Sequence, residues 1–211
     1  DEAAEEAWAE PAPRMKGLSR ERVAMELLAI LALPDPAPTI ARMRTRGVLP
    51  VILPEAGTSQ IAALERLIES EARFEVQGDA ITRLAALIPP VDGVADGVAA
   101  RLRLSRRHRE LLGCLARRQP TDGEAAKALA YAEGSECAVG RLILEGHDPR
   151  SLSQWEVPDL PLKGGEIVAR GLSGPDVSKA LREVETRWIA EDFPDRSRVL
   201  ELLDAVLAER D

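Results

Sequence analysis

Hydrophobic residues recur at helical spacing along most of the chain. Positions 23, 27, 30 and 31 form one apolar stripe, and the same spacing returns at 61, 64, 67 and 68 and again at 81, 84, 87 and 88. Residues three and four positions apart lie on the same face of an α-helix. The pattern therefore predicts amphipathic helices that pack against one another through their apolar faces.

Capping residues, prolines and glycines predict where the helices begin and end. Ser19 and Ser105 each precede a helical pattern and can cap its first turn. Further helices are predicted over residues 3–9, 39–46, 106–118, 124–131, 135–144 and 198–210 and from Asp176 onward, with a connector at 49–54 and a loop at 91–97. A stretch rich in proline and glycine, residues 145–165, marks the best domain boundary. We predict a neck (1–58), a helical body (59–150) and a helical tail (151–211).

Composition favours an all-α fold. Of the 211 residues, 32 are alanine and 28 are leucine, whereas only six are aromatic. Alanine and leucine favour helices, while sheets are enriched in β-branched and aromatic residues. We therefore predict an array of short helices. The longest apolar run, residues 27–33, is much shorter than the ~20 residues that a membrane span needs, so no membrane partner is expected.

Charge is distributed unevenly along the chain. The formal net charge of −8 argues against a nucleic-acid partner. Residues 101–118, however, hold seven arginines and one acid, so this window carries +6 and the rest of the chain −14. Guanidinium groups match phosphate oxygens, which makes phosphate the natural target. The other explanation is a solvated helix face whose arginines pair with acids elsewhere, and composition leaves both open. The seven are Arg101, Arg103, Arg106, Arg107, Arg109, Arg117 and Arg118.

The histidines and cysteines do not form a catalytic or metal-binding pattern. His147 and Asp148 make an HD doublet, but it lies in a loop before Pro149 and lacks the further ligands of a metal phosphohydrolase. Cys114 and Cys137 have no CxxC spacing. We expect both cysteines to be unpaired and buried as small hydrophobes, in a reducing compartment. The expectation is no catalytic residue, no metal ligand and a cytoplasmic location.

Aromatic residues give little support for base stacking. Trp188 and Phe193 fit the apolar pattern of the tail, which leaves Trp155 in the linker as the one stacking candidate. The glycines at 164–165 and 171–174 are interpreted as helix punctuation rather than as a phosphate-binding loop.

Several stretches, taken in order, resemble one enzyme family. Residues 18–28 read Leu-Ser-Arg-Glu-Arg-Val-Ala-Met-Glu-Leu-Leu, residues 47–55 read Gly-Val-Leu-Pro-Val-Ile-Leu-Pro-Glu, and residues 161–177 begin Pro-Leu-Lys-Gly-Gly-Glu. The first is similar to the S-x-E-R-x-x-x-E-L neck signature of bacterial tRNA nucleotidyltransferases (CCA-adding enzymes) and bacterial poly(A) polymerases. The others resemble that family's continuation and tail motif, from which Glu166 and Ser178 depart where Asp and Gly are usual.

The resemblance implies neck, body and tail without the catalytic head. In the family the head precedes the neck and holds a D-x-D carboxylate pair, and only 18 residues precede Ser19 here. Position 1 is not methionine, which we take as the mark of a lost head. Carried over to this chain, Ser19 would cap the neck helix, while Glu21, Arg22 and Glu26 would form a hydrogen-bonded brace.

The leading hypothesis is an RNA-binding, non-catalytic C-terminal portion of a template-independent RNA nucleotidyltransferase that adds CCA or A residues to RNA 3′ ends. Its partners would be the 3′ region of tRNA or another RNA and the missing head. The head would use Mg²⁺ with ATP and CTP, whereas this portion is expected to hold no cofactor and to be inactive alone. RNA contact is assigned to the seven arginines of the basic window. The alternative is a helical protein–protein scaffold with no RNA role.

Overall fold

Short helices account for the whole secondary structure of the described part of the chain. The computed structural model describes residues 19–91 and 93–209, and within them it contains no β-strand, which confirms the all-α prediction. The α-helices are α2 (Arg20–Leu31), α3 (Ala37–Thr45), α4 (Leu49–Ile52), α5 (Thr58–Phe74), α6 (Ala80–Ala86), α7 (Val94–Arg101), α8 (Arg106–Ala116), α9 (Ala126–Glu133), α10 (Ser135–Leu144), α11 (Gly164–Val168), α12 (Pro175–Ala190) and α13 (Arg196–Ala208). Two 3-10 helices, η2 (Pro120–Ala125) and η3 (Arg150–Leu152), complete the set. The helix predicted over residues 3–9 lies outside the described residues.

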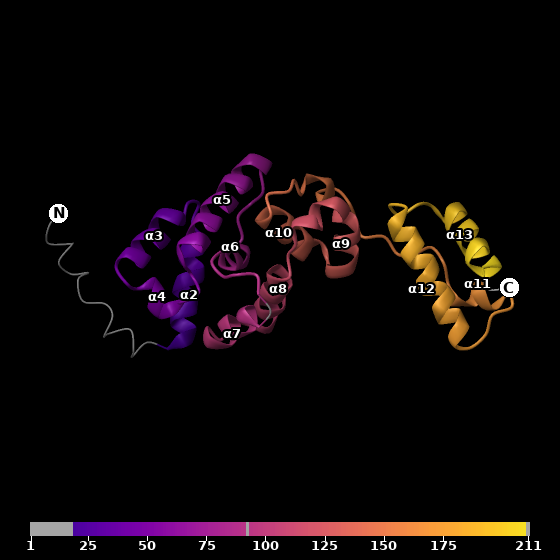
Figure 1. Cartoon of the computed structure of the whole chain (residues 1–211), viewed down its shortest axis with the longest axis horizontal. Coiled ribbons are helices and arrows are strands. Elements are labelled where there is room, and N and C mark those ends of the chain that lie inside the picture. The colour runs from indigo at the N-terminus through magenta and orange to yellow at the C-terminus, as the bar shows by residue number, and fades with distance from the viewer. Residues whose placement is uncertain (1–18, 92, 210–211) are drawn as a thin grey trace.

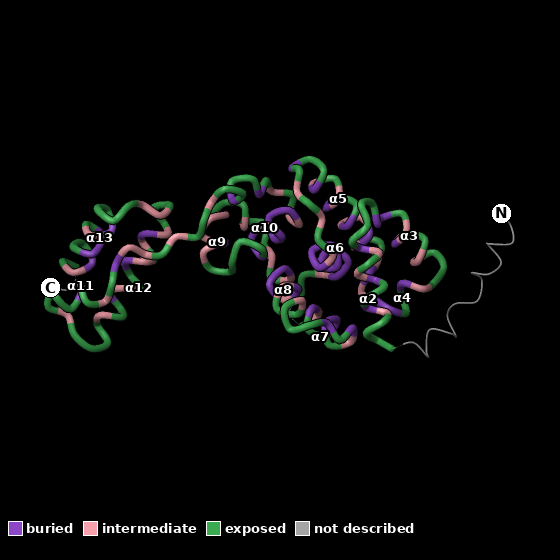
Figure 2. The backbone as a smooth tube through the Cα atoms, turned by 180° about the vertical axis from the view of Figure 1, so that it is seen from behind, coloured by how far each residue is buried: buried purple, intermediate pink, exposed green. Residues whose placement is uncertain are grey.

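The helices follow one another along an elongated molecule. Figure 1 shows α2, α3 and α4 at one end and α11, α12 and α13 at the other. The chain that connects the α9 region to the tail is exposed or half-buried, as the green and pink tube of Figure 2 shows. The predicted boundary region at 145–165 contains this connection.

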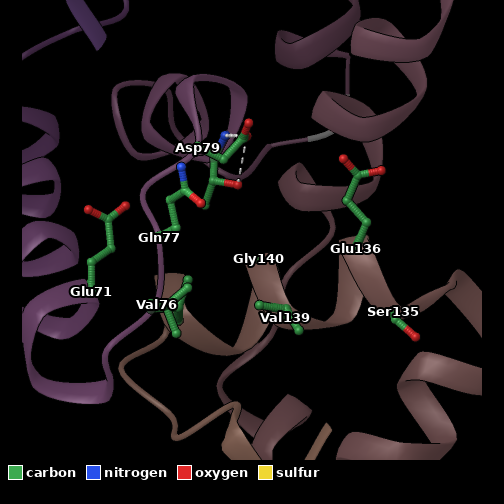
Figure 3. A pocket seen from close by; sticks show the side chains of 10 residues that line it. Glu71, Val76, Gln77, Asp79, Ser135, Glu136, Val139 and Gly140 are labelled. Carbon is green, nitrogen blue, oxygen red and sulfur yellow. Dashed lines mark hydrogen bonds between the residues drawn. The ribbon is translucent and has the colours of Figure 1, made fainter. Parts of the chain in front are cut away.

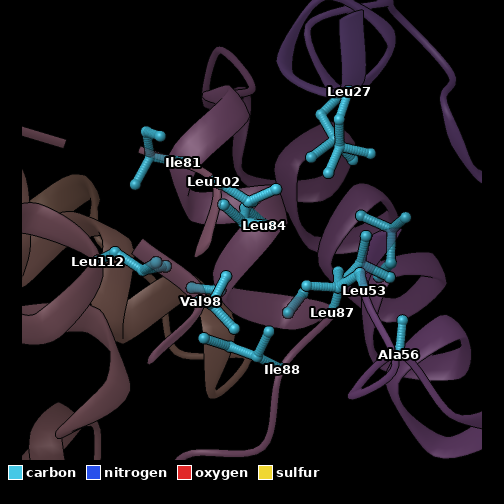
Figure 4. Close-up of a cluster of buried hydrophobic side chains, with 14 of the residues drawn as sticks. Leu27, Leu53, Ala56, Ile81, Leu84, Leu87, Ile88, Val98, Leu102 and Leu112 are labelled. Carbon is cyan, nitrogen blue, oxygen red and sulfur yellow. The ribbon is translucent and has the colours of Figure 1, made fainter. Parts of the chain in front are cut away.

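One hydrophobic core joins the helices from α2 to α8. Its buried side chains run from Ala24 to Leu115, and Ile143 of α10 adds to them. Figure 4 shows Leu27, Leu84 and Leu112, which come from three separate helices, in this cluster. The periodic apolar positions of the sequence supply nine of its 25 buried members, and all of them lie on helices or at helix ends, so the helix predictions for this region are confirmed.

A buried ion pair fixes the end of α2 within this core. Arg83 of α6 donates through Nη2 to the Glu71 carboxylate of α5 at 2.7 Å, and through Nη1 to the carbonyl oxygens of Leu31 and Leu33 at 2.7 and 2.6 Å. The side chains of Arg83 and Glu71 are only 5% and 7% exposed. The last carbonyl groups of a helix lack hydrogen-bond donors within the helix, and the Arg83 guanidinium acts as the donor here. The cost of burying this cation is offset because the guanidinium pairs with a carboxylate and donates hydrogen bonds to two backbone carbonyl groups.

The α9–α10 hairpin and the tail each have a smaller hydrophobic cluster. Buried Ala130, Ala138 and Leu142 pack beside Leu152 of η3. The tail cluster combines residues of α11, α12 and α13 with Leu162 and is separate from the body core: its buried members are Leu162, Ile167, Ala180, Val184, Trp188, Val199, Leu202, Leu203 and Val206. The tail therefore has a core of its own.

Aromatic side chains join the tail to α9. Tyr131 of α9 lies edge-on to Trp188 and also contacts Phe193, and the centroid of Trp155 lies 5.2 Å from that of Phe193. The Tyr131 hydroxyl donates to Glu185 of α12 at 2.5 Å, and this bond raises the pKa of Tyr131 to about 12. Trp188 and Phe193 belong to the tail core as predicted, while Trp155 packs against Phe193.

Cys114 and Cys137 form a disulfide, so the expectation that they are unpaired is wrong. They lie 23 residues apart on α8 and α10, and their Cα atoms are 6.2 Å apart. Gly140 allows these helices to approach, since a Cβ there would lie 2.5 Å from a side-chain atom of Leu115. Burial of both cysteines is confirmed. Their burial on facing helices is also what brings the two sulfurs together.

Residues 49–52 and 94–97, expected to be a connector and part of a loop, are helical, whereas the glycine pair at 164–165 punctuates a helix as predicted. Residues 49–52 form the single helical turn α4 with proline at an early position. The glycine pair at 164–165 begins α11, where the Glu166 carboxylate accepts a hydrogen bond from the Lys163 backbone N–H at 3.0 Å. In α4 and α11 the proline or glycine lies at the start of a helix, where it is tolerated.

Candidate nucleic-acid interface

The neck motif forms a capped helix, but its charged residues do not bond to one another. The Ser19 hydroxyl accepts a hydrogen bond from the Arg22 backbone N–H at 3.2 Å, as predicted for the cap. Glu21 instead pairs with Arg103, at the end of α7, which lowers the pKa of the Glu21 carboxyl. Within the described residues, no ion pair joins Arg22 to Glu26. The expected brace among these three residues is therefore replaced by a contact with the body.

Six of the seven arginines in the 101–118 window pair with a carboxylate of this chain. The nitrogen–oxygen distances are 2.6 Å for Arg101–Glu55, 2.8 Å for Arg106–Glu110, 2.9 Å for Arg107–Glu136, 3.3 Å for Arg117–Glu133 and 3.2 Å for Arg118–Glu145, and Arg103–Glu21 is the sixth pair. Arg109 is exposed and has no carboxylate partner in the described part of the chain. The cluster that looked free in the sequence is largely neutralised by the acids around it.

Burial divides these arginines into two groups. The Arg118 side chain is 7% exposed, and burial lowers the pKa of its guanidinium. Arg106 and Arg107 are 92% and 77% exposed and their pairs face solvent, where such pairs contribute little and exchange easily. Arg118 is thus part of the fold, while Arg106, Arg107 and Arg109 remain open to a ligand.

A groove runs between α8 and the start of α10, with a volume of about 660 Å³. Arg107, Arg109 and Arg117 line it, but so do Glu133, Glu136 and further acids. A phosphate group in this groove would meet both signs of charge. The groove therefore gives weaker support to RNA binding than the sequence suggested.

A second set of arginines, on α2 and α3, has no carboxylate partner within the described residues. We call this set the α2–α3 arginine surface; it comprises Arg20, Arg22, Arg42, Arg44 and Arg46. Four of them, Arg20, Arg22, Arg42 and Arg46, are exposed. Arg44 is half-buried and donates to the carbonyl oxygen of Ala56 at 3.5 Å. These arginines hold no carboxylate that phosphate would have to displace.

A small hollow lies between α2 and residues of α3 and α4. It has a volume of about 100 Å³ and is lined on one side by Arg22 of α2 and on the other by Met43 of α3 and Ile52 of α4. Glu26 of α2 also lines this hollow, whereas Arg42 and Arg44, which flank Met43 in the sequence, do not.

The sequence contains one indication of the α2–α3 arginine surface, a stretch with arginines and no acid. Residues 36–54 hold three arginines, at 42, 44 and 46, and no acid. A total of three charges is less conspicuous than the seven of the 101–118 window. The decisive property is the lack of an acidic partner, and only the tertiary structure reveals it.

A further pocket lies between the α5–α6 connection and α10. Its volume is about 370 Å³, and Figure 3 shows Val76 and Val139 along one side, with Gln77, Asp79 and Glu136 around it. The carboxylates already have partners: Asp79 accepts from the backbone N–H groups of Ile81 and Thr82, and Glu136 pairs with Arg107. We assign no ligand to this pocket.

The HD doublet is structural, as predicted. His147 Nε2 lies 2.8 Å from the carbonyl oxygen of Pro120, and its ring covers Gly123, where a Cβ would come within 2.6 Å. Asp148 pairs with Arg150 at 2.6 Å, which lowers the pKa of its carboxyl to about 2. His147 Nε2 and the Asp148 carboxylate therefore each contact a group of this chain.

One group of potential metal ligands exists in the described part of the chain. Ligand atoms of Cys114, Glu133 and Cys137 lie within 4.8 Å of one another. The two sulfurs are joined in the disulfide and offer no thiolate, while Glu133 pairs with Arg117. Among the described helices, none is long and apolar enough to span a membrane.

Comparison with known proteins points to the neck. Residues 1–58 match the family model described as "Probable RNA and SrmB- binding site of polymerase A". No curated protein matches the chain. The matched region contains α2, α3 and α4 and hence the whole α2–α3 arginine surface. This match agrees with the resemblance seen in the neck motif: residues 1–58 are similar to an RNA-binding region of polymerase A.

Proposed function

We propose that this protein binds RNA, and that the sugar–phosphate backbone contacts the α2–α3 arginine surface. The observation that carries the proposal is the lack of carboxylate partners for five arginines inside the matched region. Arginine binds phosphate through two parallel hydrogen bonds, and free guanidinium groups can do so without breaking an existing ion pair.

Local charge supports the same surface. Residues 19–58 contain five arginines and four acids, and two of those acids, Glu21 and Glu55, are paired with arginines of the body. When these two acids are counted as neutralised by the body, five arginines and two acids remain, so the region carries a net charge of about +3 although the whole chain is acidic. A local field of this kind attracts a polyanion irrespective of the overall charge.

We further propose that the chain is the non-catalytic C-terminal portion of a nucleotidyltransferase that adds CCA or A residues to RNA 3′ ends. The family match of the neck and the tail motif at 161–177 support this assignment. A head domain would hold Mg²⁺ with ATP or CTP, and we assign no residue of this chain to them. The cytoplasmic location stays a prediction.

A salt titration with charge-reversal variants tests RNA binding. Filter binding of tRNA to the R42E/R44E/R46E variant should be weaker than to the wild type by about 100-fold at low salt. The slope of log K against log salt should fall by about 2, because each lost phosphate contact removes about 0.7–0.9. The matched control is Arg182→Glu on α12, an exposed arginine with no carboxylate partner among the described residues.

The outcomes separate the two candidate functions. Salt-dependent binding that the triple variant loses and the control keeps supports RNA binding by the neck. Undetectable or salt-insensitive binding by the wild type overturns the proposal and leaves the protein–protein scaffold as the better explanation.

A further inference from the structure

We infer that Arg101 and Arg103 act on RNA binding through Glu55 and Glu21, as positioning residues that do not touch the RNA. The inference rests on the proposed function of the α2–α3 arginine surface. Both arginines belong to the body, and both acids lie within the matched neck. The two ion pairs neutralise two of the four carboxylates of residues 19–58 that would otherwise compete with phosphate for the neck arginines.

The contact between Arg103 and Glu21 joins residues 82 positions apart. Glu21 lies in the first turn of α2, between Arg20 and Arg22. Arg103 has a backbone φ of 50°, in the left-handed region, and follows the C-cap of α7. A non-glycine residue in this region carries a conformational cost. The backbone at Arg103 nevertheless turns in the direction that takes its side chain to Glu21.

The contact between Arg101 and Glu55 neutralises the second acid. The Arg101 Nη2 lies 2.6 Å from the Glu55 carboxylate, and the two side chains are 34% and 21% exposed. Arg101 Nε is buried and has no hydrogen-bond partner. The Arg101 guanidinium therefore has few N–H groups that a phosphate from solvent can reach, and its effect on RNA binding must pass through Glu55.

Glu55 lies close to an arginine of the surface. The next residue, Ala56, accepts a hydrogen bond from Arg44 through its carbonyl oxygen. With Arg101 absent, the Glu55 carboxylate would lose its ion-pair partner one residue from the carbonyl group that Arg44 contacts. Arg101 therefore keeps Arg44 available for a ligand.

Direct phosphate contact by Arg103 makes a different prediction from neutralisation of Glu21. If Arg103 binds phosphate, its removal weakens RNA binding whether or not Glu21 is present. If Arg103 acts only by neutralising Glu21, removal of both side chains leaves the local charge, and hence RNA binding, as in the wild type. A double-mutant cycle on this pair distinguishes the two possibilities.

The test compares the wild type, Arg103→Gln, Glu21→Gln and the double variant in tRNA binding at about 0.15 M salt, where charges more than ~8 Å apart are screened. Arg103→Gln should weaken binding by about three-fold, the effect of one added charge some 6 Å from phosphate. Glu21→Gln, which leaves Arg103 as one added positive charge, should bind about three-fold more tightly, and the double variant should bind like the wild type with an unchanged salt slope. Arg150→Gln is the matched control, since its pair with Asp148 is about as exposed as the Arg103–Glu21 pair and lies outside both arginine-rich regions.

The result that overturns the inference is a double variant that binds as weakly as Arg103→Gln, or a salt slope that falls by about 0.7 in the double variant. Thermal melting of each variant establishes that the fold is retained. If the wild type binds RNA and R42E/R44E/R46E does not, the proposed function stands even when this inference fails. If the wild type does not bind RNA, both fail.

Discussion

The two arginine-rich regions of this protein differ in what surrounds each charge. The 101–118 window has seven arginines and six of them pair with carboxylates, whereas the five arginines of the α2–α3 surface have no carboxylate partner within the described residues. The denser cluster thus serves mainly the fold and the neutralisation of neighbouring acids. Free charge, rather than total charge, indicates where a polyanion can bind.

Reduction of the disulfide tests whether α8, which carries most of the window, is a structural element. The bond closes a loop of 23 residues, so its loss should lower the free energy of unfolding by about 3 kcal/mol. Denaturant titrations with and without dithiothreitol measure this change, and RNA affinity under native conditions should stay the same. The C114S/C137S variant is the control, since its stability should not respond to reductant. A stability that is identical in both conditions contradicts the prediction.

Removal of Arg118 tests whether the buried member of the window supports the fold. Arg118→Met leaves the partly buried Glu145 unpaired and should cost about 2 kcal/mol of stability. The adjacent Arg117→Met is the matched control, with an expected cost of about 0.5 kcal/mol or less, because its pair is exposed. Chemical denaturation of both variants gives the comparison. Equal costs would mean that burial does not separate these arginines.

Charge reversal in the window tests the comparison directly. The R106E/R107E/R109E variant should weaken tRNA binding by no more than about three-fold at moderate salt, because two of these arginines already have acidic partners. Filter binding beside R42E/R44E/R46E measures the difference. A loss as large as that of the neck variant would place the RNA on α8 as well and remove the distinction between the two regions.

Acidification gives the smallest expected effect. Arg103 holds the pKa of Glu21 below its ordinary value of 4.5, so the wild-type carboxylate keeps its charge and its pair as the pH falls toward 4.5. In Arg103→Gln the Glu21 pKa returns to its ordinary range and protonation neutralises the carboxylate as the pH falls through it. The defect of that variant in binding oligouridylate, measured by fluorescence anisotropy, should shrink between pH 7 and pH 4. A defect that stays constant would count against neutralisation of Glu21.

The local features of the fold followed from the sequence, whereas its long-range contacts did not. Helical periodicity and the capping residues Ser19 and Ser105 predicted the helices that form. The Arg103–Glu21 and Arg101–Glu55 pairs span 82 and 46 positions. Such separations depend on how helices pack, which no spacing rule contains.

The same limit applies to the candidate site. The disulfide was missed because burial was read as a property of single cysteines, although two buried cysteines on facing helices can meet. The neck motif lies within the residues that the family model matches, but its internal brace is absent among the described residues and Glu21 pairs with the body instead. Residue type and order identified the region, and the three-dimensional partners decide which of its charges are free.

The separate core of the tail has a consequence for how the molecule unfolds. Its helices share few contacts with the body beyond the Tyr131, Trp155 and Phe193 rings, the Tyr131–Glu185 bond and the Lys127–Asp192 pair. A unit attached through so small an interface opens as a cooperative block of its own. Amide hydrogens of α12 and α13 should therefore exchange together, and earlier than those of α5 and α6 in the body.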